Sequence, residues 1–362
     1  MNLNIFKICA LIMVVVQGLL ILNCNNNPVG PKEQQPGRRD YVWEIDTLET
    51  PYNFMKDIWG AAPTDVWVVG DGGSRTNRLW HFDGTVWEVY NKEPIWCVGR
   101  ALHSFSADNI WMGGGAGWLS EGAGIWHYNG EEWKEFDVYN VEEANNVKIN
   151  SIHGKSPSNI YACGIIAYDQ ESEGRDSFRG FILHYNGKRW AEVYRASWES
   201  QFLEIIQTEH GVYVHSFENW ETDTFYKLAG RNLDTILSRS NAATMNLIDG
   251  TIYFMTSSKK IYQIGGINIP YKLWQTFNLE NFRYEVYGRH KEDLFLRMLD
   301  GVAHYNGTDI QQLYTFPEQS QARIMYEPMI FKEDVFFTIR DPSLGVISNM
   351  ILHGKLQEDK ED

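Results

Sequence analysis

The chain has 362 residues, of which 22% are charged and 43% hydrophobic, a balance typical of globular proteins that excludes a mainly disordered chain. Aromatic residues make up 14% and are accompanied by 31 glycines, so the composition favours strands joined by turns. The net charge of −15 argues against a nucleic-acid partner, which would require a basic surface, and four cysteines are too few for a disulfide scaffold.

The N-terminal residues indicate a targeting segment. An apolar run from Ile8 to Leu22 follows Lys7 and has the length of a signal-peptide core. The tetrapeptide Ile-Leu-Asn-Cys that ends at Cys24 resembles the bacterial lipoprotein signal, in which the cysteine is lipidated. The resemblance implies a signal peptide over residues 1–23 and a location in the cell envelope, lipid-anchored to a membrane and facing the periplasm or the exterior. The alternative is an uncleaved membrane anchor, which also places the folded part outside the cytoplasm.

Residues 24–39 predict a flexible tether, because this stretch has three prolines and no apolar run. A repeat begins after it. Its first marker is a turn residue, an apolar residue and an aromatic one, as in Asp65-Val66-Trp67, and it recurs every 40 to 52 residues. The marker aromatics are Trp67, Trp111, Tyr161, Tyr213, Tyr253, Phe295 and Phe336. A second marker, as at His127–Gly130, follows about 20 residues later and precedes a strand that often contains tryptophan.

Periods of roughly 40–45 residues with four strands per unit are typical of β-propeller blades. Seven markers therefore predict an all-β fold, a seven-bladed β-propeller with four-stranded blades over residues 40–355, with a charged tail over 356–362. The last unit lacks a fourth strand. Tyr41–Ile45 matches the fourth-strand pattern of Thr85–Val89, so we expect the N-terminal strand to close the ring.

The repeats DVWVVG…LWHFDGTVW and NIWMGG…IWHYNGEEW resemble those of bacterial extracellular β-propeller lipoproteins with degenerate Asp-box and kelch-like repeats. The resemblance covers nearly the whole chain after the tether and implies a fold, not an activity. The turn at Asp83-Gly84 lacks the Asp-box serine, and we could not place the arginine cluster, acid pair and tyrosine of a sialidase.

Most histidines and cysteines are interpreted as structural. One repeat position holds His81, His127, His184, His304 and His353, which indicates packing or hydrogen bonding in each unit rather than a metal site. Cys97 and Cys163 fall at opposite ends of their units, which predicts buried thiols, with a disulfide as the alternative. Glycines 113–115 are interpreted as a loop, and no metal or cofactor is predicted.

Long connections indicate a functional face. The predicted long loops all lie on one face, and all but the last belong to the first four units: Gly70–Asn77, Gly113–Gly124, Ile165–Gly180, Ser216–Asp223 and Asp341–Ser348. Four tryptophans outside the repeat positions lie in such connections: Trp96, Trp118, Trp198 and Trp220. We expect them to stack on sugars or anchor a protein, although they could instead fold back as plugs. Asp169, Arg175 and Arg179 complete the candidate ligand-binding set, unless their charge run is simply solvated.

The predicted function is therefore that of a monomeric, lipid-anchored binding or scaffold module for a protein or carbohydrate of the cell envelope, with no catalytic residue assigned. The alternative is a polysaccharide-active hydrolase or lyase in the same cleft. That chemistry needs two carboxylates, one with a raised pKa. The sequence offers Asp169, Glu173, Glu199 and Glu221 for this role.

Overall fold

The computed structural model describes residues 37–48, 54–71, 79–90, 92, 95–116, 122–170, 175–240, 243–265, 270–318, 320, 322–324, 326–342 and 348–357. They belong to one unit, Gly37–Asp362. Its described elements are all β-strands, which confirms the predicted all-β class. In this part of the chain no helix is long and apolar enough to cross a membrane. The predicted lipid site, Cys24, lies outside the described residues.

Four sheets are antiparallel meanders of four strands, in which each strand pairs with the next along the chain. The first two hold β2 (Phe54–Ala62), β3 (Asp65–Asp71), β4 (Leu79–Phe82) and β5 (Trp87–Val89), then β14 (Ser200–Thr208), β15 (Gly211–Glu218), β16 (Thr222–Ala229) and β17 (Asn232–Ser240). The other two hold β18 (Ala243–Ile248), β19 (Thr251–Thr256), β20 (Lys260–Ile264) and β21 (Tyr271–Thr276), then β22 (Phe282–His290), β23 (Asp293–Met298), β24 (Gly301–Tyr305) and β25 (Ile310–Thr315).

The remaining strands form an eight-stranded and a five-stranded sheet. The eight-stranded sheet contains β6 (Cys97–Ser106), β7 (Asn109–Ala116), β8 (Ala123–Tyr128), β9 (Trp133–Tyr139), β10 (Asn146–Ser156), β11 (Asn159–Gln170), β12 (Arg175–Tyr185) and β13 (Trp190–Trp198). The five-stranded sheet contains β1 (Tyr41–Leu48), β26 (Arg323–Ile324), β27 (Met329–Ile330), β28 (Asp334–Asp341) and β29 (Ser348–Leu356).

The prediction of a seven-bladed propeller with four-stranded blades is wrong, because the described strands form five small sheets and one wide sheet. β10 pairs with β7 through Lys148 and Gly115. Gly113–Gly115 lie inside β7 and not in the predicted loop. A Cβ on Gly115 would meet Lys148 Cγ at 2.6 Å, and one on Gly113 would meet Ile149 Cγ2 at 2.5 Å. The missing side chains therefore let the two backbones approach closely enough to pair.

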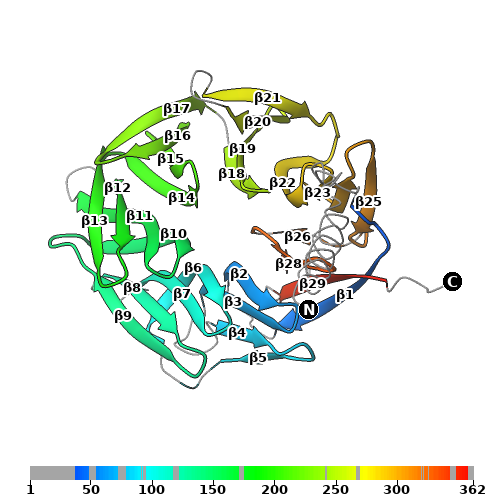
Figure 1. The fold of residues 1–362 in the computed structure, drawn as a ribbon, viewed down its shortest axis with the longest axis horizontal. Helices are drawn as coiled ribbons and strands as arrows, with labels where there is room; N and C mark the ends of the chain where they lie inside the picture. Colours follow the sequence, from blue (N-terminus) through cyan, green and yellow to red (C-terminus); the bar gives the residue numbers. More distant parts are fainter. Residues whose placement is uncertain are drawn as a thin grey trace, which may run out of the picture. The chain divides into compact units, whose positions relative to one another are not determined.

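Within the described unit the sheets follow one another around a ring, with β2, β14 and β22 among the strands nearest its centre (Figure 1). The two ends of this unit share a sheet. β1 pairs along its whole length with β29, from Tyr41 opposite Leu356 to Leu48 opposite Asn349. The predicted pairing of the N-terminal strand with the last strands is therefore confirmed.

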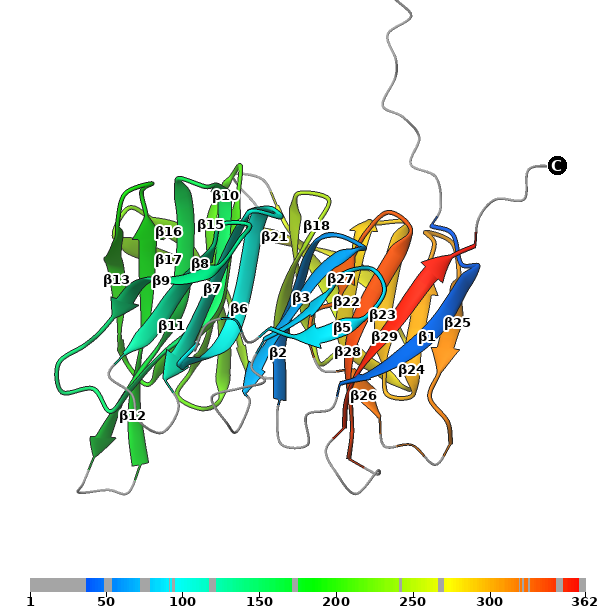
Figure 2. The same ribbon diagram turned by 90° about the horizontal axis from the view of Figure 1, so that it is seen from below.

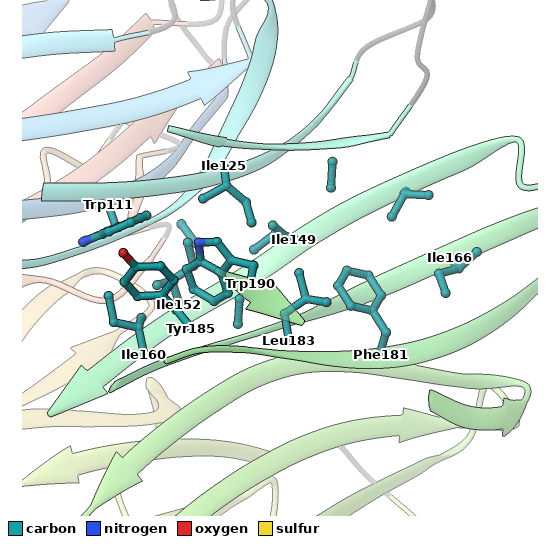
Figure 3. Close-up of a cluster of buried hydrophobic side chains, with 14 residues drawn as sticks. Trp111, Ile125, Ile149, Ile152, Ile160, Ile166, Phe181, Leu183, Tyr185 and Trp190 are labelled. Atoms are coloured by element: carbon teal, nitrogen blue, oxygen red, sulfur yellow. The ribbon is translucent and has the colours of Figure 1, made fainter. Parts of the chain in front are cut away.

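Clusters of buried apolar side chains lie between neighbouring meanders and hold them together. One of them, drawn in Figure 3, packs Trp111 of β7 against Tyr185 and Trp190 of the next meander. The ring centroids of Trp111 and Tyr185 are 5.0 Å apart, and those of Trp111 and Trp190 are 5.8 Å apart. Because such residues recur once per repeat, each tryptophan marker contributes to a junction.

The repeated histidines have the structural role predicted for them. Each Nε2 lies 2.7–3.0 Å from the Asp or Asn that begins the neighbouring strand, in the pairs His81–Asp65, His127–Asn109, His184–Asn159, His304–Asp293 and His353–Asp334. In three of these repeats the marker aromatic stacks on the histidine ring, as for Phe336 and His353, whose centroids are 4.0 Å apart. Cys97 and Cys163 are both buried and are not bridged, as predicted.

One predicted loop is also wrong. The segment Ile165–Gly180 is largely strand, since β11 continues to Gln170 and β12 begins at Arg175. The two strands stay paired to the end, with Asp169 opposite Asp176. The backbone N–H and C=O groups of this segment therefore form hydrogen bonds between the two strands, whereas in a loop they would bind water. The result is a hairpin that extends beyond its neighbours at one edge of the ring (Figure 2).

Candidate functional site

Two exposed tryptophans and two half-buried aromatic side chains gather on the flanks of the β11–β12 hairpin. We call the set Tyr168, Phe178, Arg179, Trp198 and Trp220 the hairpin cluster. Successive residues of a strand point to opposite sides of the sheet, so the neighbours Phe178 and Arg179 of β12 serve different flanks. Both flanks lie on the face where second strands end and third strands begin, because Trp220 follows β15 and precedes β16.

Trp198 forms the first flank. It ends β13 directly opposite Arg179 and keeps 51% of its surface exposed. The Arg179 guanidinium lies 5.3 Å from the centroid of the Trp198 ring, a cation–π arrangement, and its Nε donates a 2.9 Å hydrogen bond to the carbonyl of Ala196. Tyr168 meets the same indole edge to face at 5.1 Å. The Trp198 indole is therefore held by its neighbours while much of its surface faces solvent.

Trp220 forms the second flank and is 56% exposed. Its ring meets Phe178 edge to face at 5.2 Å, and its Nε1 donates a 3.0 Å hydrogen bond to the carboxylate of Glu199. Trp220 and Glu199 both have left-handed backbones, with φ of 61° and 62°. Such conformations cost free energy in residues other than glycine and persist only where the surroundings impose them. The turn thus holds a large apolar side chain out in solvent.

The structure gathers three of the seven sequence-predicted ligand-binding residues in this cluster: Arg179, Trp198 and Trp220. Trp96 lies elsewhere, since it packs against a core cluster that includes Trp67, and its Nε1 donates a hydrogen bond to Glu135. The backbones of Asp169 and Arg175 belong to the hairpin ladder. Their side chains, and the whole of Trp118, lie outside the described residues.

The acids considered for catalysis do not form a pair in the described structure. Glu199 accepts the hydrogen bond from Trp220, and Glu221 is exposed in the same turn. Glu173 and the side chain of Asp169 lie outside the described residues. Among the side chains that are described, no group of three or more His, Cys, Asp or Glu residues could hold a metal ion.

Sequence reasoning missed four acids whose charges act on one another, the central carboxylates Asp57, Glu204, Glu285 and Glu327. Three belong to strands near the centre of the ring, β2, β14 and β22 (Figure 1), and Glu327 lies between β26 and β27. Each stands nine or ten residues before a marker aromatic, and this offset could have revealed them. The equivalent positions in other repeats, such as Ala101 and Ser151, are not acidic, so no motif is visible.

The central carboxylates influence each other's protonation. Burial raises the pKa of Asp57 from 3.8 to about 7; the negative charge of Glu327 adds to the rise, and the N–H of Leu102 opposes it. Solvent reaches Glu327, yet the surrounding protein displaces enough water to raise its pKa to about 7, with help from Glu285. Burial, followed by the charge of Glu327, raises the pKa of Glu204 as well. At neutral pH the carboxyl groups of Asp57 and Glu327 are therefore partly protonated.

No family model matches the chain, and no curated protein matches it. Solved structures do. An oligogalacturonate lyase in complex with manganese has a TM-score of 0.58 at 8% identity, over 90% of this chain and 99% of that one. The WD40 domain of Neurospora crassa Pan2 has a TM-score of 0.57 at 10% identity, over 90% and 98%. BBS1N in complex with ARL6DN has a TM-score of 0.50 at 12% identity, over 89% and 98%. At these identities the likeness shows the fold alone, which is that of a β-propeller.

Proposed function

We propose that the chain is a lipid-anchored cell-envelope protein whose β-propeller binds a protein partner through the hairpin cluster. The observation that carries the proposal is the exposure of Trp198 and Trp220, 51% and 56%, on the flanks of one hairpin. Tryptophan, tyrosine and arginine, three of the residue types in the cluster, supply most binding hot spots in protein interfaces. A projecting hairpin fits a groove on another protein better than it encloses a small ligand, which prefers a concave site.

The lipid anchor of this proposal rests on the sequence, and the scaffold role rests on the architecture. The apolar run Ile8–Leu22 and the lipoprotein-like Cys24 support anchoring at the envelope. The architecture supports a scaffold role only in general terms, since the similar solved propellers include both a lyase and a protein captured with its partner. A carbohydrate partner, stacked on the indole faces, is the competing outcome that the experiment must separate.

The test uses the full chain in detergent, immobilised and exposed to envelope extract, with a glycan array in parallel. Trp198→Ala/Trp220→Ala is compared with Leu273→Ala, a control that removes an apolar side chain 53% exposed on β21. We expect one defined protein to be retained by the wild type and the control, and at least roughly tenfold less by the double variant. Binding to glycans alone would identify a carbohydrate partner, and equal retention by all three proteins would contradict the proposal.

One observation favours a second candidate, a polysaccharide hydrolase or lyase. The pKa of Asp57 and that of Glu327 both lie at about 7, where a carboxyl group can give as well as accept a proton. The test is to incubate the wild type and Glu327→Gln with a panel of polysaccharides and to measure new reducing ends and unsaturated products. Cleavage by the wild type that Glu327→Gln abolishes supports catalysis. No cleavage of any polysaccharide by the wild type excludes it for the panel.

A further inference from the structure

A pocket of about 410 Å³ lies beside the start of β22 and the end of β23, on the same face of the ring as Trp220. Its volume falls in the range of small-molecule sites, about 300–1,000 Å³. Among the described residues that line it are three arginines, Arg283, Arg297 and Arg323, and one acid, Glu285. In a chain with a net charge of −15, this is a local excess of positive charge.

A bulge in β22 builds the pocket. Phe282 pairs with Met298 and Val286 with Leu296, so the three residues Arg283–Glu285 stand opposite the single residue Arg297. The central strands β2, β6, β10 and β14 each omit only one residue at this place. Tyr284, in the middle of the bulge, has a left-handed φ of 65°. A bulge redirects side chains, and strained backbone in a non-glycine residue is concentrated at functional sites.

The acid that lines this pocket pairs with only one of its three arginines. Glu285 is already engaged, because Nη1 of Arg297 lies 2.8 and 2.7 Å from its two oxygens and the Tyr287 hydroxyl donates to it at 2.7 Å. Arg323 is exposed and donates to the carbonyl of Ala322. Arg283 is exposed and has no hydrogen bond or ion pair with any other residue that the structure describes.

One further acid acts near the pocket. Burial and the negative charge of Glu285 raise the pKa of Glu327 to about 7, so Glu327 is only partly charged at neutral pH. The guanidinium groups of Arg283 and Arg323 therefore remain available to an anion from solution.

We propose that this pocket binds a small organic anion, held at its carboxylate or phosphate group by Arg283 and Arg323. Planar guanidinium groups bind both oxyanions through paired N–H donors. Arg297, locked by Glu285, forms a fixed wall, and Tyr284 lines the pocket beside them. This site is distinct from the hairpin cluster, so the inference does not depend on the proposed protein partner.

The test titrates the full chain in detergent, by calorimetry and by thermal shift, with glucuronate, citrate, glucose 6-phosphate, inorganic phosphate and neutral glucose. The variant is Arg283→Gln/Arg323→Gln, and the matched control is Arg231→Gln, an exposed arginine of the β16–β17 turn on the opposite face. We expect binding of at least one organic anion but not of glucose, weakened at least tenfold in the double variant, unchanged in the control and reduced by added salt. Comparing the affinities of the carboxylates with those of the phosphates identifies which of the two groups the site prefers.

Three results would overturn the inference: equal anion binding by the double variant and the wild type, equal binding of glucose and glucuronate, or no binding of any anion by the wild type. A double variant with a lowered melting temperature is replaced by Arg283→Lys/Arg323→Lys. That variant keeps the charge but loses the planar donor pairs, so we expect it to bind with intermediate affinity.

Discussion

The carboxylate of Asp57 in β2 accepts a 2.7 Å hydrogen bond from the backbone N–H of Leu102 in β6, so one side chain joins the first sheet to the wide sheet. Its other oxygen accepts a 2.8 Å bond from the N–H of Ile58. Both donors are backbone groups that would lose their partner if the side chain were removed. The junction therefore depends on an acidic or amide side chain at this position.

The protonation of Asp57 makes this junction sensitive to pH. Its pKa is about 7 in the folded protein, against 3.8 in a free side chain. The stabilisation that this raised pKa gives is complete below about pH 4 and is lost as the pH rises toward 7. Asp57→Asn keeps an acceptor but cannot ionise. As the pH rises over this range, the stability of Asp57→Asn should therefore increase relative to that of the wild type. The difference in their free energies of unfolding should change by up to about 1 kcal/mol per pH unit. Urea unfolding of both proteins across the range measures the gain, and a constant difference would refute it.

Arg39 fastens the start of the described unit to the β24–β25 region. Its guanidinium donates to Nδ1 of His304 at 3.2 Å and to the carboxylate and carbonyl of Asp309 at 2.8 and 2.7 Å. We expect Arg39→Ala to lower the free energy of unfolding by about 1–3 kcal/mol, because these partners lose their donors. Lys332→Ala, at a side chain 92% exposed, is the control and should change it by less than about 0.5 kcal/mol. Equal effects in urea unfolding would show that Arg39 is only a surface contact.

Lipidation at Cys24 remains a prediction from the sequence. Cys24→Ala should abolish fatty-acid labelling and either release the protein from membranes or stall its processing, because the lipid is attached to that thiol. Cys9→Ala, inside the apolar run, is the matched control and should leave labelling intact. Labelling that survives Cys24→Ala would show that the N-terminal segment is an ordinary anchor.

Tryptophans at repeat positions and tryptophans of the hairpin cluster should differ in their contribution to stability. Trp67 is 2% exposed and packs against Tyr128 and Trp133 of the neighbouring meander. Trp67→Ala should therefore cost about 3–5 kcal/mol of unfolding free energy through the cavity it leaves. Trp220→Ala should cost less than about 1 kcal/mol. If urea unfolding gives the two variants equal losses, Trp220 is a plug and not a binding residue.

The repeat made much of the architecture predictable. Markers such as Trp111 and His127 recur because each repeat needs the same packing and hydrogen bonding, and such needs leave a sequence period. The N-terminal strand was recognisable over Tyr41–Ile45 for the same reason, and the structure extends it to Leu48. The merging of two meanders into one sheet could not be predicted, because it depends on how closely β10 approaches Gly113–Gly115. In the sequence, glycines inside a strand cannot be distinguished from glycines in a loop.

The candidate sites were harder to predict because they break the repeat. Trp198 and Trp220 were found as tryptophans without a repeat position, whereas Arg283 resembles any surface arginine until the bulge in β22 is known. The central carboxylates remained hidden because only some repeats have an acid at the position of Asp57. The ring brings these acids together, so that the charge of Glu327 acts on Asp57 although the two residues are more than two hundred positions apart in the chain.

The most direct test of the proposed binding role is site-specific photo-crosslinking in the producing cells. A photoreactive phenylalanine analogue replaces Trp198 or Trp220 in turn, and Leu273 as the exposed control. We expect positions 198 and 220 to crosslink to the same envelope protein and position 273 not to crosslink to it. Crosslinks to an envelope protein from position 273, with none from position 198 or 220, would contradict the proposed binding role.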